Sequence, residues 1–311
     1  MESNLLYRLY FAPRSLMRRV ISRYPRLAGP VERGKRWLKR RVLPQGEKWV
    51  RVRRGLCEGL EMRLHFPEEA GVWLGDHEPE VQEAIAAAVR QGATVIDVGA
   101  AIGVMALGMA RLVGSRGSVI AFEADPVQAA RLREHAAANG FERTLQIVQE
   151  AVWSQTDAAT IAFRCGRQMR TQGGVEADGI APVLGGGDGA GELIEVPVTT
   201  LDAWCAATGA APELIKIDVE GGEIEVLRGG ERMIAKHRPL LIAEIHTSQM
   251  RDAFRAWLRE HEYAAQEQVL FDPAPVRYFA WPRERMPEPW VRMGVKASTI
   301  YGVTTCRRLF R

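Results

Sequence analysis

Short apolar runs alternate with helix-forming stretches from about residue 80 onward, and few folds accommodate that order. The predicted strands cover residues 93–98, 118–122, 145–148, 214–217 and 240–243, and the predicted helices cover 81–91, 103–112, 126–138 and 223–236. Strands that alternate with helices of about 10–15 residues require right-handed crossovers. The chain is therefore predicted to be an α/β protein whose mostly parallel central sheet is covered by helices on both faces.

Four regions of different character divide the 311 residues. We expect a basic helical N-terminal arm at 1–47, a β-hairpin and lead-in at 48–80, an α/β domain at 81–265 and a C-terminal extension with strands at 266–311. Within them, helices are predicted at 14–24 and 28–42, and the hairpin strands at 49–54 and 60–64. The glycine-rich segment 171–192 is predicted to be a flexible surface loop.

The net charge of +4 conceals an uneven distribution. The first 54 residues contain 16 Lys and Arg but only 3 Asp and Glu, a net charge of +13, so the remainder carries −9. A basic arm on a mildly acidic body indicates an anionic partner, such as membrane phospholipid, nucleic acid or an acidic glycan. The other interpretation is that the arm docks on the acidic surface of its own body, and the sequence leaves both open.

The sequence also bears on the cellular compartment. No uncharged stretch approaches the roughly 18 residues that a membrane-spanning helix needs, and residues 1–13 lack the core of a secretory signal. The cysteines lie far apart, at Cys57, Cys165, Cys205 and Cys306. This spacing argues against a disulfide scaffold and a zinc site. We expect a cytoplasmic protein with reduced thiols, and the basic arm would allow contact with the inner face of the membrane.

A glycine bend follows the first predicted strand. Gly99 allows a sharp turn off the strand, and Gly103 is expected to let the start of the next helix approach a ligand. Asp97, at the end of the strand, can meet a cationic amino group. Glu123 ends the next strand, where a carboxylate can accept both hydroxyls of a ribose. Together these residues predict an adenosine-containing cofactor, without separating NAD from S-adenosylmethionine.

Two further groups of charged residues end the fourth and fifth predicted strands. Lys216, Asp218 and Glu220 crowd charge into one strand end, which is costly unless they contact a ligand, a metal or a paired base. Glu244 and His246 follow the fifth strand and face the same side if that strand continues. An imidazole has the right chemistry for a general base near neutral pH, so His246 is a candidate for that role.

These motifs resemble the FkbM-type family of class I S-adenosylmethionine-dependent methyltransferases. The resemblance covers roughly residues 72–246 and is most specific in the Asp-Val-Glu-Gly-x-Glu element at 218–223. It also includes VIDVGAAIG (95–103), AFEADP (121–126), VTTLDAW (198–204), VLRGGE (226–231) and RPLLIAEIH (238–246). It implies a Rossmann-like class I methyltransferase fold, with the basic arm and the chain after about residue 265 outside the family pattern.

The resemblance also implies roles for individual residues. The methionine part of the cofactor would lie on Asp97, Gly99, Ala100 and Gly103, with Asp218 close by. Glu123 and Ala124 would hold the ribose, and Glu150 and Ala151 would flank the adenine. The acceptor would face Asp218, Glu220, Glu244 and His246. This sequence has Ala101 where the family usually has Asn, which removes one polar contact with the cofactor.

We expect O-methylation of a hydroxyl on a sugar, a glycan or a polyketide-like small molecule, with His246 or Asp218 taking the proton and Glu220 orienting the acceptor. Carboxylates at Asp218, Glu220 and Glu244 would suit Mg²⁺, but no metal signature is present, so no metal site is assigned. One alternative is a degenerate methyltransferase domain that tethers an assembly or binds a membrane, and another is a nicotinamide-dependent oxidoreductase. No base-flipping or reader motif points to nucleic acid, and a homo-oligomer stays open.

Overall fold

The computed structural model describes residues 43–154, 160–165, 174–175, 192–270 and 275–285. The predicted arm helices at 14–24 and 28–42, most of the glycine-rich segment 171–192 and the end of the chain after 285 lie outside these residues. No helix in the described ranges is long and apolar enough to cross a membrane.

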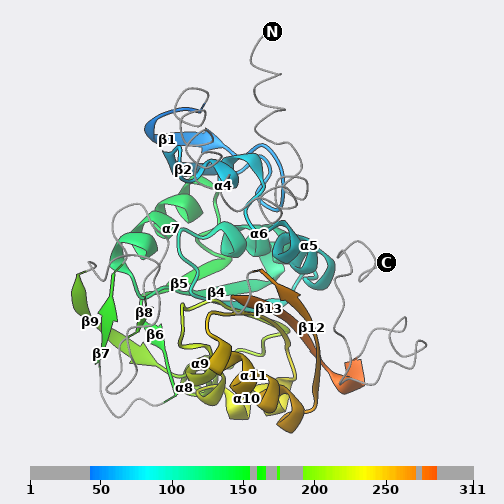
Figure 1. Ribbon diagram of the computed structural model, residues 1–311. Coiled ribbons are helices and arrows are strands. Elements are labelled where there is room, and N and C mark those ends of the chain that lie inside the picture. Colours follow the sequence, from blue (N-terminus) through cyan, green and yellow to red (C-terminus); the bar gives the residue numbers. More distant parts are fainter. Residues whose placement is uncertain (1–42, 155–159, 166–173, 176–191, 271–274, 286–311) are drawn as a thin grey trace, which may run out of the picture.

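A seven-stranded sheet forms the centre of the molecule, in the order β12-β13-β11-β10-β3-β4-β5 (Figure 1). Its strands are β3 (Thr94–Val98), β4 (Ser118–Phe122), β5 (Leu145–Val148), β10 (Leu214–Ile217), β11 (Leu240–Ile245), β12 (Tyr263–Val269) and β13 (Val276–Pro282). β13 is inserted between β11 and β12 and runs opposite to both, while β11, β10, β3, β4 and β5 are parallel. The predicted mostly parallel sheet is therefore confirmed.

Helices cover both faces of this sheet, as predicted (Figure 1). One layer contains α5 (Pro79–Ala88), α6 (Val104–Val113) and α7 (Pro126–Ala138), and the other contains α8 (Leu201–Thr208), α9 (Glu223–Arg228), α10 (Glu231–His237) and α11 (Ser248–Glu260). The side chains of β3 alternate between two cores, with Val95 packed in one and Ile96 in the other. Burial on both faces explains why the central strands read as uninterrupted apolar runs.

The predicted hairpin is present as β1 (Gly46–Arg51) and β2 (Glu61–Phe66), which pair antiparallel. Polar contacts as well as apolar packing attach it to α7. The side chain of Asn139 accepts from Glu61 N at 2.9 Å and donates to Glu61 O at 2.8 Å. His135 accepts from Arg63 N at 2.9 Å and contacts Ile102 O at 2.8 Å. These bonds fix the segment that follows β2, including α4 (Ala70–Leu74), near the carboxyl ends of the parallel strands.

The long connection between β5 and β10 contains a second, smaller sheet that the sequence pattern did not predict. Its strands are β6 (Ala151–Val152), β7 (Thr160–Arg164), β8 (Gly174–Val175) and β9 (Leu193–Thr199), in the order β6-β9-β7-β8. Phe163 and Val196 anchor its small core. The sheet lies beside the end of β5, so it can contribute side chains to the same edge of the central sheet.

One predicted helix is wrong in its extent. Residues 223–236 were expected to form a single helix, but the structure divides them into α9 and α10 at Gly229 and Gly230. A Cβ at Gly229 would lie 2.0 Å from the carbonyl oxygen of Trp153. Asp202 occupies the break, where its carboxylate accepts from Arg232 N at 3.1 Å and Met233 N at 2.7 Å. The break therefore lets a side chain from α8 cap α10.

We expect Asp202→Ala to lower the free energy of unfolding by about 1–2 kcal/mol, because it removes both backbone contacts at the start of α10. Asp252→Ala on α11 is the control, since the Asp252 side chain is 80% exposed and its loss should cost less than about 0.5 kcal/mol. Urea unfolding of both variants measures the difference. Equal losses would show that Asp202 does not cap α10.

Candidate functional site

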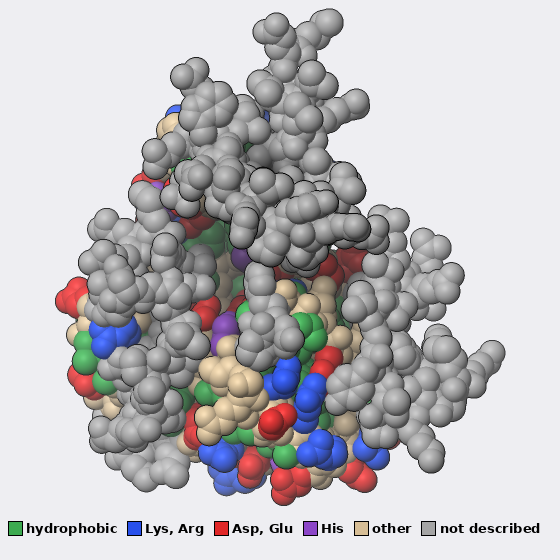
Figure 2. Space-filling view, viewed as in Figure 1, with side chains coloured by type: hydrophobic (Ala, Val, Ile, Leu, Met, Phe, Trp, Pro, Cys, Tyr) green, Lys and Arg blue, Asp and Glu red, His purple; other side chains and the backbone are tan. Residues whose placement is uncertain are grey.

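A cavity of about 590 Å³ opens where β3, β4 and β10 end. Its position coincides with the point where the strand order reverses, between β3 and β10, which is where ligands bind in sheets of this kind. The segment around α4 closes another side of it. Acidic and histidine side chains come to the surface in the recessed middle of the face shown in Figure 2. The strand ends singled out in the sequence therefore meet at one hollow.

Asp97 and Gly99 form the part of the wall contributed by β3. Asp97 is fully buried, and within the described residues neither of its carboxylate oxygens has a hydrogen-bond partner; Lys216 Nζ lies 3.5 Å away. Burial raises the pKa of Asp97 to about 6. Gly99 has φ of 78°, and a Cβ there would lie 1.9 Å from the carbonyl oxygen of Asp218. The close contact between the ends of β3 and β10 thus requires glycine.

Glu123 lies at the end of β4 and also lines the cavity. It accepts hydrogen bonds from Ala101 N at 2.6 Å and Asp125 N at 2.8 Å. Burial raises its pKa to about 7, and these two donors oppose the rise. The backbone of Ala101, rather than a polar side chain at that position, joins the glycine bend to β4. Glu123 therefore shapes the bend as well as facing the cavity.

One end of the cavity is more apolar, because Ala124, Ala151 and Phe163 pack together there. Ala100 and Glu150, which the sequence also assigned to the cofactor, line the cavity as well. Trp153 and Phe163 line it as well, and sequence reasoning missed both. Phe163 comes from the unpredicted strand β7, so no pattern in the sequence connected it with the glycine bend.

Gly103 does not line the cavity formed by the described residues. Its φ is 92°, and a Cβ there would lie 2.0 Å from Leu132 Cδ1. The expectation that Gly103 makes room for a ligand is therefore replaced by a packing role, in which the missing side chain lets α6 approach α7.

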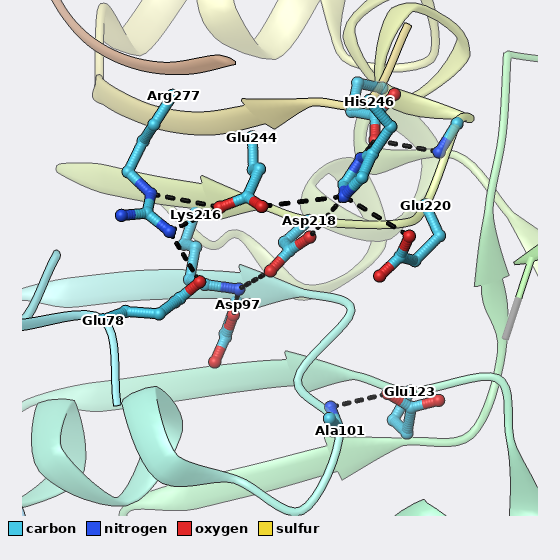
Figure 3. A network of polar contacts seen from close by, with 12 residues as sticks. Glu78, Asp97, Ala101, Glu123, Lys216, Asp218, Glu220, Glu244, His246 and Arg277 are labelled. Carbon is cyan, nitrogen blue, oxygen red and sulfur yellow. Dashed lines mark hydrogen bonds and ion pairs between the residues drawn. The ribbon is translucent and has the colours of Figure 1, made fainter. Parts of the chain in front are cut away.

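Buried ion pairs connect the charged residues at this edge of the sheet (Figure 3). Lys216 lies between Asp97 and Asp218, at 3.5 and 3.3 Å. Although burial opposes its charge, the two carboxylates raise the pKa of Lys216. Arg277 of β13 bonds to Glu244 at 2.5 Å and to Glu78 at 2.7 Å. Each strand end thus brings a carboxylate that faces a buried cation.

His246 lies behind this edge and does not line the cavity in the described part of the chain. Its Nδ1 is 2.7 Å from Oε1 of the fully buried Glu223, and its Nε2 lies 3.4 Å from Glu220, 3.7 Å from Asp218 and 3.8 Å from Glu244. Burial lowers its pKa, but these carboxylates outweigh that effect and raise it to about 10. The surrounding carboxylates therefore favour the protonated imidazole, which counts against the expected role of His246 as the base.

The remaining expected catalytic residues differ in proton affinity. Burial alone would raise the pKa of Asp218, but Lys216 and His246 lower it, so Asp218 is a weak base. Burial raises the pKa of both Glu220 and Glu244 to about 7. The surroundings of Asp218 thus do not support the expectation that it takes the proton. The pKa values of Glu220 and Glu244, in contrast, lie near neutral pH.

Backbone strain is concentrated around the cavity. Among the residues that the structure describes, five other than glycine have positive φ, and three of them line the cavity: Glu78 (46°), Ala101 (49°) and Glu220 (55°). Such conformations cost of order 1 kcal/mol each and cluster at functional sites. The strain supports this cavity as the functional site.

Sequence reasoning assigned no role to Glu78, His77, Glu223 or Arg277. Glu78 and His77 line the cavity, and Arg277 and Glu223 pair with carboxylate and histidine residues of the site. Arg277 is 199 residues away from Glu78 in the chain and carried no local signal. Glu78 lies within residues 72–246, over which the resemblance extends, but no motif there marked it as part of the site.

Two trios of side chains could bring ligand atoms together for a metal ion. They are Asp218, Glu220 and His246, and Glu78, Asp218 and Glu244, with the atoms of each trio within 4.8 Å of one another. In both trios the carboxylates already face Lys216, Arg277 or His246. Because these cations supply the counter-charge, we assign no metal ligand here.

One family of known proteins matches more than half of this chain. The family model described as "Methyltransferase FkbM domain" matches residues 97–265. A solved FkbM methyltransferase from Methylobacillus flagellatus is similar over 61% of this chain and 44% of that chain, at 18% identity and a TM-score of 0.42. The chain thus spans less than half the length of that relative.

Two further solved structures are similar at 13% identity. An S-adenosylmethionine-dependent O-methyltransferase from Thermotoga maritima covers 81% of this chain and 83% of its own, with a TM-score of 0.40. Fibrillarin from Aeropyrum pernix, solved with natively bound S-adenosylmethionine, covers 64% and 74%, with a TM-score of 0.39. No curated protein matches the chain.

Gly103→Ala should lower the free energy of unfolding by about 2–4 kcal/mol, because it adds a clash with Leu132 to the strain of a positive φ. Gly140→Ala is the matched control, since Gly140 has φ of 69° and nothing within 4 Å of its Cβ position; it should cost about 1 kcal/mol. Denaturant unfolding measures both. Introducing Leu132→Ala into the Gly103→Ala protein should cost less than it does in the wild type; additive losses would contradict the packing role.

His246→Gln should change how stability depends on pH. The pKa of His246 is about 10 when folded, above its ordinary unfolded value of about 6.5, so its contribution is complete below pH 6.5 and lost as pH rises to about 10. The difference in unfolding free energy between wild type and variant should therefore narrow from pH 6 to pH 10. Urea titrations across this range measure it, with His237→Gln on α10 as the control. A difference that stays constant would refute the assigned cation.

Proposed function

This chain belongs to the FkbM methyltransferase domain family, and from that premise we propose that it transfers a methyl group from S-adenosylmethionine to a hydroxyl of a sugar, a glycan or a polyketide-like small molecule. The observation that carries the proposal is the buried carboxylate of Asp97. It faces the cavity without a hydrogen-bond partner among the described residues, at the point where the strand order reverses. Lys216 Nζ lies 3.5 Å from this carboxylate, whose oxygens still lack hydrogen-bond donors, and a cationic amino group of a ligand would supply them.

The residues that line the cavity fit S-adenosylmethionine as the methyl donor. Asp97 would bind its amino group, and the turn at Gly99 and Ala100 would lie against its methionine part. Glu123 would accept the ribose hydroxyls with the lone pairs that Ala101 N and Asp125 N leave free. When bound, S-adenosylmethionine supplies a methyl group on a sulfonium sulfur, which is already a good leaving group. The protein mainly has to align the acceptor with that methyl.

The apolar end of the cavity suits an adenine ring. Ala124, Ala151 and Phe163 line it, and Trp153 and Glu150 lie beside them. Apolar walls with a few polar groups at fixed positions are typical of cofactor sites, and a cavity of about 590 Å³ falls within the usual range of roughly 300–1,000 Å³. The volume therefore supports a nucleoside donor in this cavity.

The opposite, acidic end suits an acceptor that is rich in hydroxyls. Glu220, Asp218 and Glu244 line it, and a carboxylate can only accept hydrogen bonds from the acceptor. The buried cations behind them keep their positions fixed. An acceptor with a phosphate or carboxylate would be repelled here, which favours a sugar or another polyol. The strained backbone of Glu220 supports its role in orienting the acceptor.

Asp97→Asn should weaken binding of S-adenosylhomocysteine by about 10–100-fold, because it removes a charged hydrogen-bond partner of the amino group. Calorimetry measures the affinity of the wild type and of the variant, with Asp252→Asn as an exposed control. If neither S-adenosylmethionine nor S-adenosylhomocysteine gives binding heat with the folded wild type, the proposal is overturned in favour of a degenerate domain. Methylation of a panel of sugars, glycans and polyketide-like hydroxyls, with and without Mg²⁺, then identifies the acceptor.

A further inference from the structure

Two histidines lie in or beside the site, and their surroundings shift their pKa values in opposite directions. His246 is held by four carboxylates and is a cation at neutral pH. His77 lies in the lead-in between α4 and α5, 20 positions before the start of the family match at residue 97. Where the surroundings move the pKa values of two titratable groups apart, the group with the lower pKa is the one available to act as a base.

The backbone of His77 is fixed against the lead-in. Nε2 of Gln82 donates to the carbonyl of His77 at 2.5 Å, and Oε1 of Gln82 accepts from Leu56 N at 2.6 Å. The Gln82 side chain is buried, so both contacts are sheltered from water. On the other side, Glu78 begins α5 and is paired with Arg277. His77 is thus held between two anchored neighbours.

His77 lines the cavity, and within the described parts of the chain its imidazole makes no hydrogen bond. The charges that act on it are those of Glu78 in its own segment, Lys216 and Asp218 at the end of β10, and Arg277 of β13. Burial lowers its pKa, as do Lys216 and Arg277, while Glu78 and Asp218 act in the opposite sense without restoring the ordinary value. The imidazole is therefore neutral at pH 7 and carries a free lone pair.

The carboxylates at the acceptor end are less suited to take a proton. Glu244 bonds to Arg277, Asp218 faces Lys216, and Glu220 lies 3.4 Å from His246. Although burial raises the pKa of Glu220 and Glu244 to about 7, a carboxylate that gains the proton weakens its ion pair and leaves a buried cation with less counter-charge, which is costly. The neutral imidazole of His77 has no ion pair to lose.

We propose that His77 is the general base of the reaction, because it lines the same cavity as Asp218, Glu220 and Glu244 and its imidazole makes no hydrogen bond among the described residues. This assignment rests on the proposed function. An oxygen–methyl bond forms while the sulfur–methyl bond breaks, the sulfur keeps the electron pair, and the hydroxyl proton passes to His77. The acidic wall therefore faces one positive charge before the step, on the sulfonium, and one after it, on the imidazolium. Release of that proton to solvent returns His77 to its neutral form.

Histidine NMR on the full chain tests this without an acceptor. The six histidines are labelled with ¹⁵N, and the signals of His77 and His246 are assigned by their loss in His77→Gln and His246→Gln. S-Adenosylmethionine carries one more positive charge than S-adenosylhomocysteine, at the sulfur. If His77 faces the methyl group, its titration midpoint should be lower with the methyl donor than with the product by about one pH unit.

The expected result is a His77 that is neutral at pH 7 and whose midpoint differs between the two ligands. A protonated His77 at pH 7, or equal midpoints with both ligands bound, overturns the assignment. Calorimetry on the same sample separates the two proposals, because absence of binding by either ligand refutes the methyltransferase function and not the base alone. If His77→Gln does not fold, His77→Asn provides the assignment.

Turnover on an acceptor from the panel gives the second readout. His77→Gln should lower kcat by about 10²–10⁴-fold and remove the acidic limb of the pH profile, with the affinity for S-adenosylhomocysteine unchanged. His237→Gln, on α10, is the matched control and should retain wild-type turnover. A His77→Gln protein that keeps full turnover with the wild-type pH profile contradicts the assignment.

Discussion

Charge balance at the carboxyl edge of the sheet is the constraint on which the rest of the site depends. Six carboxylates meet there, from Glu78, Asp97, Asp218, Glu220, Glu223 and Glu244, and they could not be buried together without cations. Lys216, Arg277 and His246 supply those cations from three different strand ends. Their positions decide which carboxylates are hydrogen-bonded and which, like Asp97, lie near a cation yet keep both oxygens without a hydrogen-bond partner among the described residues.

The same balance of buried charges makes the two ends of the cavity suited to different ligands. Glu123 is held by two backbone donors, and Asp97 lies 3.5 Å from Lys216 without a hydrogen bond among the described residues, which leaves capacity for a ligand with an amino group and hydroxyls. Around Glu244 the carboxylates are held by buried cations, which fixes the wall that an acceptor would meet. Two segments outside the family match, the lead-in with Glu78 and strand β13 with Arg277, complete that wall. Variation in such flanking segments can change the acceptor while the donor end stays constant.

Much of the fold was accessible from the sequence because its signals are local. Buried parallel strands read as apolar runs, and the turn at Gly99 follows from a position where no side chain fits. The division of 223–236 was missed because a pair of glycines is compatible with a continuous helix until Asp202 and Trp153 occupy the break. The small sheet containing Phe163 was missed because its strands pair across a long connection, and nothing near them in the chain indicates their partners.

By itself, the sequence determined the α/β architecture, the residues at each strand end and the family, since all three are written in short continuous motifs. The tertiary structure decided the protonation states and the partners. His246 had the right chemistry for a base, but four carboxylates make it a cation; His77 had no recognised motif, yet burial and two cations keep it neutral. Gly103 serves helix packing for a similar reason, because Leu132 reaches it from α7. A pKa and a packing contact depend on which atoms are near in space, and those atoms come from parts of the chain as far apart as Glu78 and Arg277.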